Sequence, residues 1–323
     1  MRRTNWVKSF FSSALAWAVT LGFFLALPLE QSAHAAGEGL QFLSGGVPTF
    51  TSIDTPGVRA LGRGSSGLAL ADGPEAFFLN PAGLSHMNYS YAEGGIYFHP
   101  NADNRVFNIS VADGKTNPFV AGGMSYSHYI AARPDDGKFP SVFGHIVRLA
   151  TAVNYKKIIS VGVNLKYIHL DRPFNPPLSG VNLDVGVTWQ IIPGLRLSAV
   201  GYNLIYNDSL ETPIALGVGL AFAGLKNLPL RISVDWVMDF QTRQAIANEF
   251  GHELRVGISY TFVQMITLRA GYHWDHTRDK HLIGAGLGFK YKNFGLEAAY
   301  RQQLATGEQA YDHFFGFSAK LYF

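Results

Sequence analysis

The chain has 323 residues, of which 15% are charged, well below the roughly 25% of an average soluble protein. Glycine (35 residues) and aromatic residues (14%) are abundant. Cysteine is absent, which excludes a disulfide framework and a lipid-modified cysteine. The formal net charge of +3 falls to +1 without residues 1–35, so nothing in the charge favours a nucleic acid partner.

The N-terminus has the pattern of a secretory signal peptide. Three basic residues within the first eight precede Phe10–Leu29, which carries no charge, and Ala33-His34-Ala35 supplies small residues at the cleavage positions. We therefore predict that residues 1–35 are a signal peptide, cut after Ala35 or Ala36. An uncleaved membrane helix is the alternative, because twenty apolar residues can span a bilayer. No later apolar run reaches eighteen residues, which argues against a helical membrane protein.

Residues 36–87 are rich in Gly, Ser and Pro and do not have the pattern of strands. Within them, Asn80-Pro81 favours a turn, and Gly83 permits close approach of the backbone to another element. A turn that leads into the first strand, without any ligand contact, is the simpler interpretation of Asn80, Pro81, Ala82 and Gly83.

Two runs in this segment, Val58–Asp72 (VRALGRGSSGLALAD) and Ala76–Leu84 (AFFLNPAGL), resemble the N-terminal signature of the FadL/TodX superfamily of outer-membrane transporters. They are especially similar to its compact PorV/PorQ-type branch. Arg63 and the pair Ser65-Ser66 depart from the small, glycine-rich residues usual there. The resemblance implies a fourteen-stranded barrel whose residues 36–87 fold into the lumen as a hatch, with Asn80, Pro81, Ala82 and Gly83 in its gating part. In the fatty-acid transporters of the superfamily, the hatch controls passage of hydrophobic compounds. In PorV-type relatives, the barrel serves protein secretion and surface attachment.

Residues 88–323 contain fourteen segments with strand character. Four of them, 181–190, 230–239, 253–262 and 266–275, alternate between apolar and polar residues with a period of two, Val237 being an exception. This pattern predicts an all-β fold: a 14-stranded antiparallel transmembrane β-barrel with lipid on its apolar face. A soluble β-sandwich is the alternative, but it would carry more surface charge.

Connector lengths support the barrel independently. Short connectors at 155–156, 192–194, 263–264 and 292–293 alternate with longer polar stretches near 130–140, 171–180, 203–212, 240–251, 275–280 and 303–310. Bacterial outer-membrane barrels have short periplasmic turns and longer external loops. Aromatic girdles are expected at both interfaces: Tyr167, Phe240, Trp274 and Tyr300 outside, and Trp189, Phe262, Tyr291, Phe294 and Phe323 inside.

The last strand ends on an aromatic residue at the C-terminus. Phe315, Phe317, Ala319, Leu321 and Phe323 share one face. We interpret Phe315, Phe317, Leu321 and Phe323 as the signal that the barrel assembly machinery recognises.

The predicted lumen carries charges of both signs on neighbouring strands, which suits cross-strand ion pairs and contacts with the hatch. A polar conduit is the alternative interpretation. The residues concerned are Arg231, Asp235, Asp239, Glu253, Arg255, Arg269, Asp275, Lys290, Glu297 and Arg301.

Other chemistry is weakly supported. Gly62–Gly67 matches G-x-G-x-x-G but lacks the strand and helix of a dinucleotide site. His273, Asp275, His276 and His281 form no fixed tetrahedral set, so we expect no metal and no cofactor. No spacing pairs a serine nucleophile with a histidine base, so we expect no enzyme.

Two functions stay open at this stage, both in the bacterial outer membrane with its lipid as a neighbour. The first is passive transport of hydrophobic or amphiphilic small molecules. The second is a non-transporting barrel that binds a secreted or surface protein. A general porin is disfavoured by the predicted hatch.

Overall fold

The computed structural model describes residues 57–99, 104–117, 119–131, 142–171, 177–205, 212–224, 228–276, 278–304 and 313–323. All of them belong to one compact unit, residues 38–323. The predicted signal peptide and residues 36–56 of the predicted hatch lie outside the described residues.

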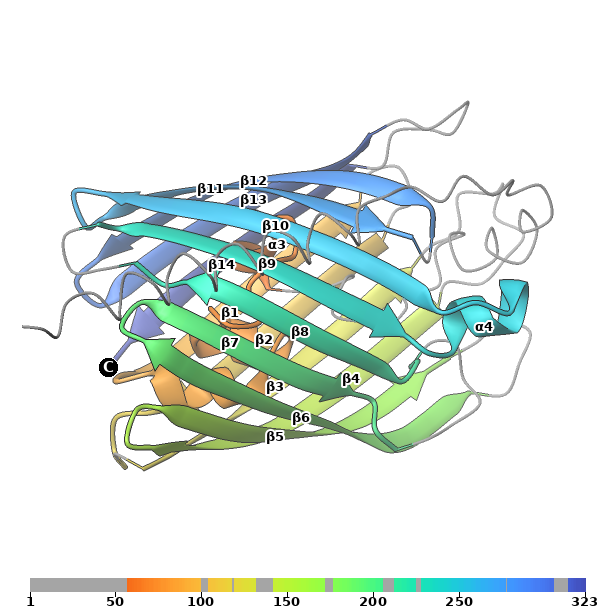
Figure 1. Ribbon diagram of the computed structural model, residues 1–323, viewed down its shortest axis with the longest axis horizontal. Coiled ribbons are helices and arrows are strands. Elements are labelled where there is room, and N and C mark those ends of the chain that lie inside the picture. Colours follow the sequence, from red (N-terminus) through yellow and green to blue (C-terminus); the bar gives the residue numbers. More distant parts are fainter. Residues whose placement is uncertain are drawn as a thin grey trace, which may run out of the picture. The chain divides into compact units, whose positions relative to one another are not determined.

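The described strands form one closed, antiparallel barrel (Figure 1). Each strand pairs with its neighbours in sequence, and the last strand closes the ring by pairing with the first, for example Gly94 with Ala319. The predicted 14-stranded antiparallel barrel is therefore confirmed. Its strands are β1 (Ser90–His99), β2 (Asn104–Asp113), β3 (Val120–Ala131), β4 (Val142–Tyr155), β5 (Ile159–Leu170), β6 (Leu178–Ile192), β7 (Leu195–Tyr202), β8 (Ala215–Phe222), β9 (Leu230–Asp239), β10 (Gly251–Phe262), β11 (Ile266–Asp275), β12 (Lys280–Tyr291), β13 (Phe294–Leu304) and β14 (His313–Tyr322).

The two faces of the barrel wall differ in chemistry, as the period of two predicts. In β5 the exposed positions include Val161, Val163 and Leu165, whereas the alternate positions Asn164 and Lys166 are buried. An exposed apolar exterior is what a barrel in hydrocarbon requires. Strand lengths range from 8 residues in β7 to 15 in β6, wider than the 9–11 expected for the membrane-crossing part alone.

The two ends of the barrel carry different connections. Strand β1 begins and strand β14 ends at the end of the barrel where Gly194, Val263 and Lys292 lie in short turns. Figure 1 shows the C-terminus at that end and the helix α4 (Thr242–Ala247), between β9 and β10, at the opposite end. We call these the short-turn end and the loop end. None of the helices among the described residues is long and apolar enough to cross a membrane.

Aromatic residues are exposed at both ends on the outer face. Of the predicted outer girdle, Tyr167 is exposed near the loop end, whereas Phe240, Trp274 and Tyr300 are only partly exposed. All of the predicted inner girdle is exposed, at or near the short-turn end: Trp189, Phe262, Tyr291, Phe294 and Phe323. The sequence did not predict the histidines that also lie at the loop end. His128, His145 and His169, from three adjacent strands, stack with ring centroids 4.6 and 6.4 Å apart.

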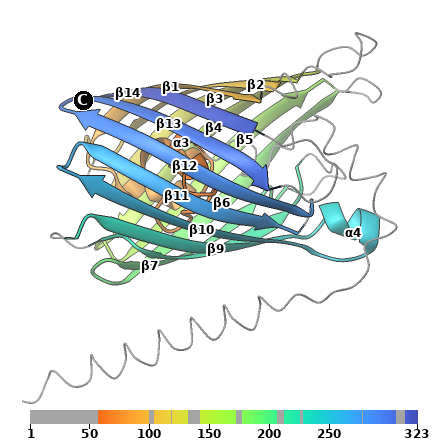
Figure 2. The same ribbon diagram turned by 90° about the horizontal axis from the view of Figure 1, so that it is seen from above.

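The segment that precedes β1 forms three short helices: α3 (Val58–Leu61) and the 3-10 helices η1 (Gly73–Phe77) and η2 (Pro81–His86). Figures 1 and 2 show this segment, in orange, surrounded by the strands. Most of its side chains between Val58 and Leu84 are buried, including the charged Arg63 and Glu75. We call residues 57–87 the inner segment.

Candidate functional site inside the barrel

The inner segment turns at Asn80, one of the predicted gating residues. The Asn80 side chain accepts a hydrogen bond from the nitrogen of Ala82 and so caps η2, with Pro81 at the first helical position. Its amide nitrogen donates at 3.0 Å both to the carbonyl of Leu68 and to the hydroxyl of Thr188 on β6. Asn80 therefore joins two parts of the inner segment to the barrel wall.

Glycines of the wall face the inner segment where the two backbones meet. A Cβ on Gly162 of β5 would lie 2.3 Å from the nitrogen of Ala82, and one on Gly186 of β6 would lie 2.0 Å from the Asn80 side chain. On the opposite wall, a Cβ on Gly271 would lie 2.0 Å from the carbonyl oxygen of Arg63. No side chain fits at these distances, so the wall glycines form seats for the inner segment.

Strand β9 holds the inner segment through polar side chains. The carboxylate of Asp235 accepts hydrogen bonds from the nitrogens of Gly67, at 2.5 Å, and Leu68, at 3.0 Å. The hydroxyls of Ser66 and Ser233 lie 2.8 Å apart. Ser66 is one of the residues that depart from the superfamily pattern, and here it is a point of attachment to the wall.

Arginines and carboxylates cross-link the inner segment internally. Arg59 pairs with Asp72 at 2.7 Å and with Glu75 at 3.3 Å, and Arg63 pairs with Glu75 at 2.9 Å. Arg231 on β9 approaches Asp72 at 3.5 Å and so links the inner segment to the wall. Burial opposes ionisation of Asp72, but the nearby Arg59 and Arg231 outweigh it and hold the pKa of this carboxyl well below its usual range.

His86 closes the inner segment before β1. Burial, reinforced by the charge of Arg196, lowers the pKa of His86 to about 4. Its Nε2 lies 3.2 Å from the hydroxyl of Ser160 on β5, so the neutral imidazole is held against the wall.

Predicted lumen charges at the loop end form a network among the strands. Glu253 lies 2.5 Å from Arg255 and 3.1 Å from His273. Arg255 also donates to the carbonyl of Ser65, at 3.4 Å, and so reaches the inner segment. These contacts tie β10, β11 and the inner segment together.

The other predicted charges have mostly local partners. Asp239 accepts from Thr242 at the start of α4, and Asp275 pairs with Arg278 at 3.0 Å. Arg269 pairs with Glu297 at 2.7 Å, and Arg301 lies over the ring of Phe314. Lys290 lies over the ring of Tyr322, 4.3 Å from its centroid.

A buried pair between β5 and β6 was not predicted, although the alternation of β6 was recognised from the sequence. Lys166 on β5 lies 2.6 Å from Asp184 on β6 and donates to Asn203. Beside it, Asn164 donates to the carbonyl of Phe77 in η1. The spacing of Asn164 and Lys166, two positions apart among apolar neighbours on β5, is the pattern that could have predicted this pair.

The inner wall near the loop end is apolar, contrary to the polar lumen that alternation alone suggests. Buried apolar side chains from β1 to β5 and β14 pack with Val58 and Leu61 of α3. They are Tyr97, Val106, Tyr129, Ile146, Ile168, Leu170 and Phe314. We call this set the apolar lining. It explains why these strands lack clean alternation, because both of their faces are apolar there.

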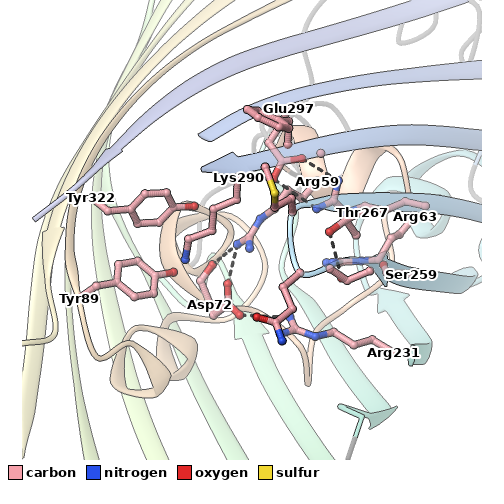
Figure 3. A pocket seen from close by; sticks show the side chains of 16 residues that line it. Arg59, Arg63, Asp72, Tyr89, Arg231, Ser259, Thr267, Lys290, Glu297 and Tyr322 are labelled. Atoms are coloured by element: carbon pink, nitrogen blue, oxygen red, sulfur yellow. Dashed lines mark hydrogen bonds and ion pairs between the residues drawn. The ribbon is translucent and has the colours of Figure 1, made fainter. Parts of the chain in front are cut away.

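A polar cavity of about 240 Å³ lies at the short-turn end, between the inner segment and strands β9 to β13 (Figure 3). Side chains of Arg59, Arg231 and Lys290 are directed into it. Five cations and two carboxylates line it: Arg59, Arg63, Arg231, Arg269 and Lys290, with Asp72 and Glu297. Within the described ranges, no three His, Cys, Asp or Glu side chains are placed to hold a metal ion.

Solved structures share this barrel. The CymD monoaromatic hydrocarbon channel superposes with a TM-score of 0.66 at 12% identity, covering 84% of this chain and 99% of the other. The toluene transporter TbuX of Ralstonia pickettii gives 0.62 at 14% identity, covering 83% and 98%. A FadL homologue of Pseudomonas aeruginosa gives 0.57 at 13% identity, covering 85% and 99%. No family model matches the sequence, and no curated protein is similar to it.

These similarities define the class of fold. At such low identity they show a shared barrel architecture, which is that of hydrocarbon transporters and FadL homologues. The FadL-type fold expected from residues 58–84 is thereby confirmed, and the finer likeness to the PorV/PorQ-type branch stays a prediction.

Proposed function

We propose that this chain is an outer-membrane barrel through which hydrophobic or amphiphilic small molecules pass without energy input, and that residues 36–87 form its hatch. The observation that carries the proposal is the apolar lining, which extends inside the barrel from the loop end to α3. A barrel that only conducts water and ions has a polar interior. The shared fold with hydrocarbon channels supports the same function.

The route follows from the two kinds of lumen surface. An incoming molecule enters at the loop end and loosens the packing of Tyr129, Ile146 and Ile168, which are buried at rest, before it meets the inner segment at α3. Movement of the inner segment off its glycine seats opens a way to the cavity at the short-turn end. The many contacts of the inner segment keep the resting barrel closed.

The membrane and the assembly machinery are the partners that this function requires. The exposed apolar exterior, which includes Phe317, Leu321 and Phe323, suits outer-membrane lipid. We propose that the same C-terminal residues, with Phe315, are recognised during assembly. No chemical step is needed for passage, so the proposal includes no catalysis and no cofactor.

Uptake by proteoliposomes tests the proposal. The probe is 4-nitrobenzenesulfonate, an amphiphile whose permanent charge hinders direct passage through lipid, since a charge at the bilayer centre costs at least about 2.5 kcal/mol. Wild-type protein should accelerate uptake over protein-free vesicles. Ile168→Gln, which makes the apolar lining polar, should slow it severalfold, whereas the matched control Ile168→Leu should not.

Uptake no faster than in protein-free vesicles, from protein shown to be folded by its heat-resistant β-sheet circular dichroism, would contradict transport. It would favour the second candidate, a closed barrel that serves protein secretion, surface attachment or assembly. One observation suits that candidate: the inner segment is attached to the wall on two separate strands, at Thr188 of β6 and Asp235 of β9.

A further inference from the structure

The cavity at the short-turn end has more positive than negative charge. Five cations line it, together with the carboxylates of Asp72 and Glu297. Glu75, which pairs with Arg59 and Arg63, raises the number of carboxylates to only three. Uncompensated charges in a partly enclosed space are costly, and a bound counter-charge relieves that cost. The imbalance therefore favours an anion in the cavity.

Two of the cations have few protein carboxylates nearby that would compete with a bound anion. Arg231 has half-exposed side-chain atoms and approaches Asp72 only at 3.5 Å. Lys290 contacts the rings of Tyr322 and Tyr89, at 4.3 and 5.7 Å from their centroids, and no carboxylate among the described residues lies within ion-pair distance of it. An ammonium group in this setting keeps its three donors available.

The remaining wall suits an anion with a small apolar body. Tyr89 and Tyr322 pack edge to face, with ring centroids 5.2 Å apart, and Met265 also lines the cavity. The 240 Å³ volume greatly exceeds the about 10–15 Å³ that one water molecule needs.

We propose that this cavity is a binding site for a small oxyanion, such as an organic carboxylate or a phosphate, held by Lys290, Arg231 and Arg59. Lys290 and Arg231 come from the wall and Arg59 from the inner segment, so the bound anion bridges the two. The inference deepens the proposed function, because it assigns a ligand class to the exit side of the route. Binding itself does not require that transport occurs.

Fluorine NMR of 4-fluorobenzoate with the full-length mature protein in a zwitterionic detergent tests the site. The probe should show saturable line broadening that hexanoate or inorganic phosphate displaces, and high salt should weaken it. The more effective competitor identifies whether the oxyanion is organic or inorganic. Lys290→Gln should raise the Kd at least about tenfold, and Lys290→Arg should retain binding.

Lys292→Gln is the matched control. It removes the same charge two residues away, in a turn where Lys292 lies against the ring of Tyr291, and should leave the Kd unchanged. Absence of saturable binding, or an equal Kd in wild type and Lys290→Gln, would overturn the proposal. The two proposals can be contradicted separately. Oxyanion binding without uptake would contradict only transport. Uptake, together with an equal Kd in wild type and Lys290→Gln, would contradict only this site.

Discussion

The carboxylate of Asp235 accepts a hydrogen bond from the backbone nitrogen of Gly67 at 2.5 Å, and so connects β9 to the inner segment across 168 residues of sequence. The same carboxylate accepts a second bond, from Leu68. Asp235→Ala would leave two buried N–H groups without an acceptor. Hydrogen bonds to charged groups contribute roughly 1.5–3 kcal/mol each, so we expect docking of the inner segment to weaken by about 3 kcal/mol.

Amide hydrogen exchange of residues 57–87 measures this change, because local opening is more frequent than global unfolding. Asp113→Ala is a suitable control, since among the described residues Asp113 accepts hydrogen bonds from Ser90, Lys115 and Thr116, all outside the inner segment. Equal exchange in Asp235→Ala and wild type would contradict the anchoring role of Asp235.

A side chain on the seat at Gly162 should displace the inner segment. The Cβ of Gly162→Ala would lie 2.3 Å from the nitrogen of Ala82, a backbone atom that cannot move alone. Overpacking of this kind costs about 1–3 kcal/mol. We expect faster protease cleavage within residues 57–87 while the barrel stays intact.

Gly94→Ala is the control for this substitution, because a Cβ there meets no atom within 4 Å. Its cleavage rate should equal that of the wild type. If Gly162→Ala were cleaved equally slowly, the close approach of η2 to β5 would be wrong.

The pKa of about 4 for His86 predicts a dependence on pH. Above the usual value of about 6.5, His86 is neutral in both states and its contribution to stability is fully present. Between pH 6.5 and 4 the unfolded chain binds a proton that the folded chain does not, so the free energy of unfolding falls as the pH falls. The loss is at most about 3 kcal/mol.

The difference between wild type and His86→Gln isolates this contribution, because other groups titrate equally in both. The wild type should lose more thermal stability than His86→Gln between pH 7 and pH 4.5. A parallel loss in the two proteins would show that His86 titrates normally.

The buried pair of Lys166 and Asp184 should stabilise the wall rather than the inner segment. Lys166→Met leaves the Asp184 carboxylate buried without its cation, which typically costs about 3–5 kcal/mol. Urea denaturation in lipid vesicles should show that the free energy of unfolding of Lys166→Met is lower than that of the wild type by this amount. The exposed Lys156→Met, in the turn before β5, should cost less than about 0.5 kcal/mol.

Sequence patterns predicted the barrel because its two faces differ in chemistry, with apolar side chains outside and many polar ones inside. Where the inner face is polar, as in β6 and β9 to β11, alternation was clear and the strands could be placed. Between β1 and β5 the apolar lining makes both faces alike near the loop end, so the period of two weakens and the lining was missed. The histidine stack was missed for a related reason, because His128, His145 and His169 come together only through strand register.

The site was less predictable than the fold. The residues Arg231 and Lys290 could be assigned to the lumen from alternation, but their common cavity depends on the position of Arg59 and Asp72. That position follows from long-range contacts such as Asn80 with Thr188, which have no local signature. Arg63 and Ser66 depart from the superfamily pattern, yet each has a buried partner, Glu75 and Ser233 respectively.

If the inner segment closes the barrel and must move for passage, a reversible cross-link between it and the wall should block uptake. The chain has no cysteine, and the hydroxyls of Ser66 and Ser233 lie 2.8 Å apart, so Ser66→Cys with Ser233→Cys can form a single disulfide between the inner segment and β9. Oxidised protein in proteoliposomes should take up 4-nitrobenzenesulfonate no faster than protein-free vesicles, and a reductant should restore wild-type uptake, while each single-cysteine variant behaves as wild type throughout. Wild-type uptake by the fully oxidised double variant would show that passage does not require movement of the inner segment.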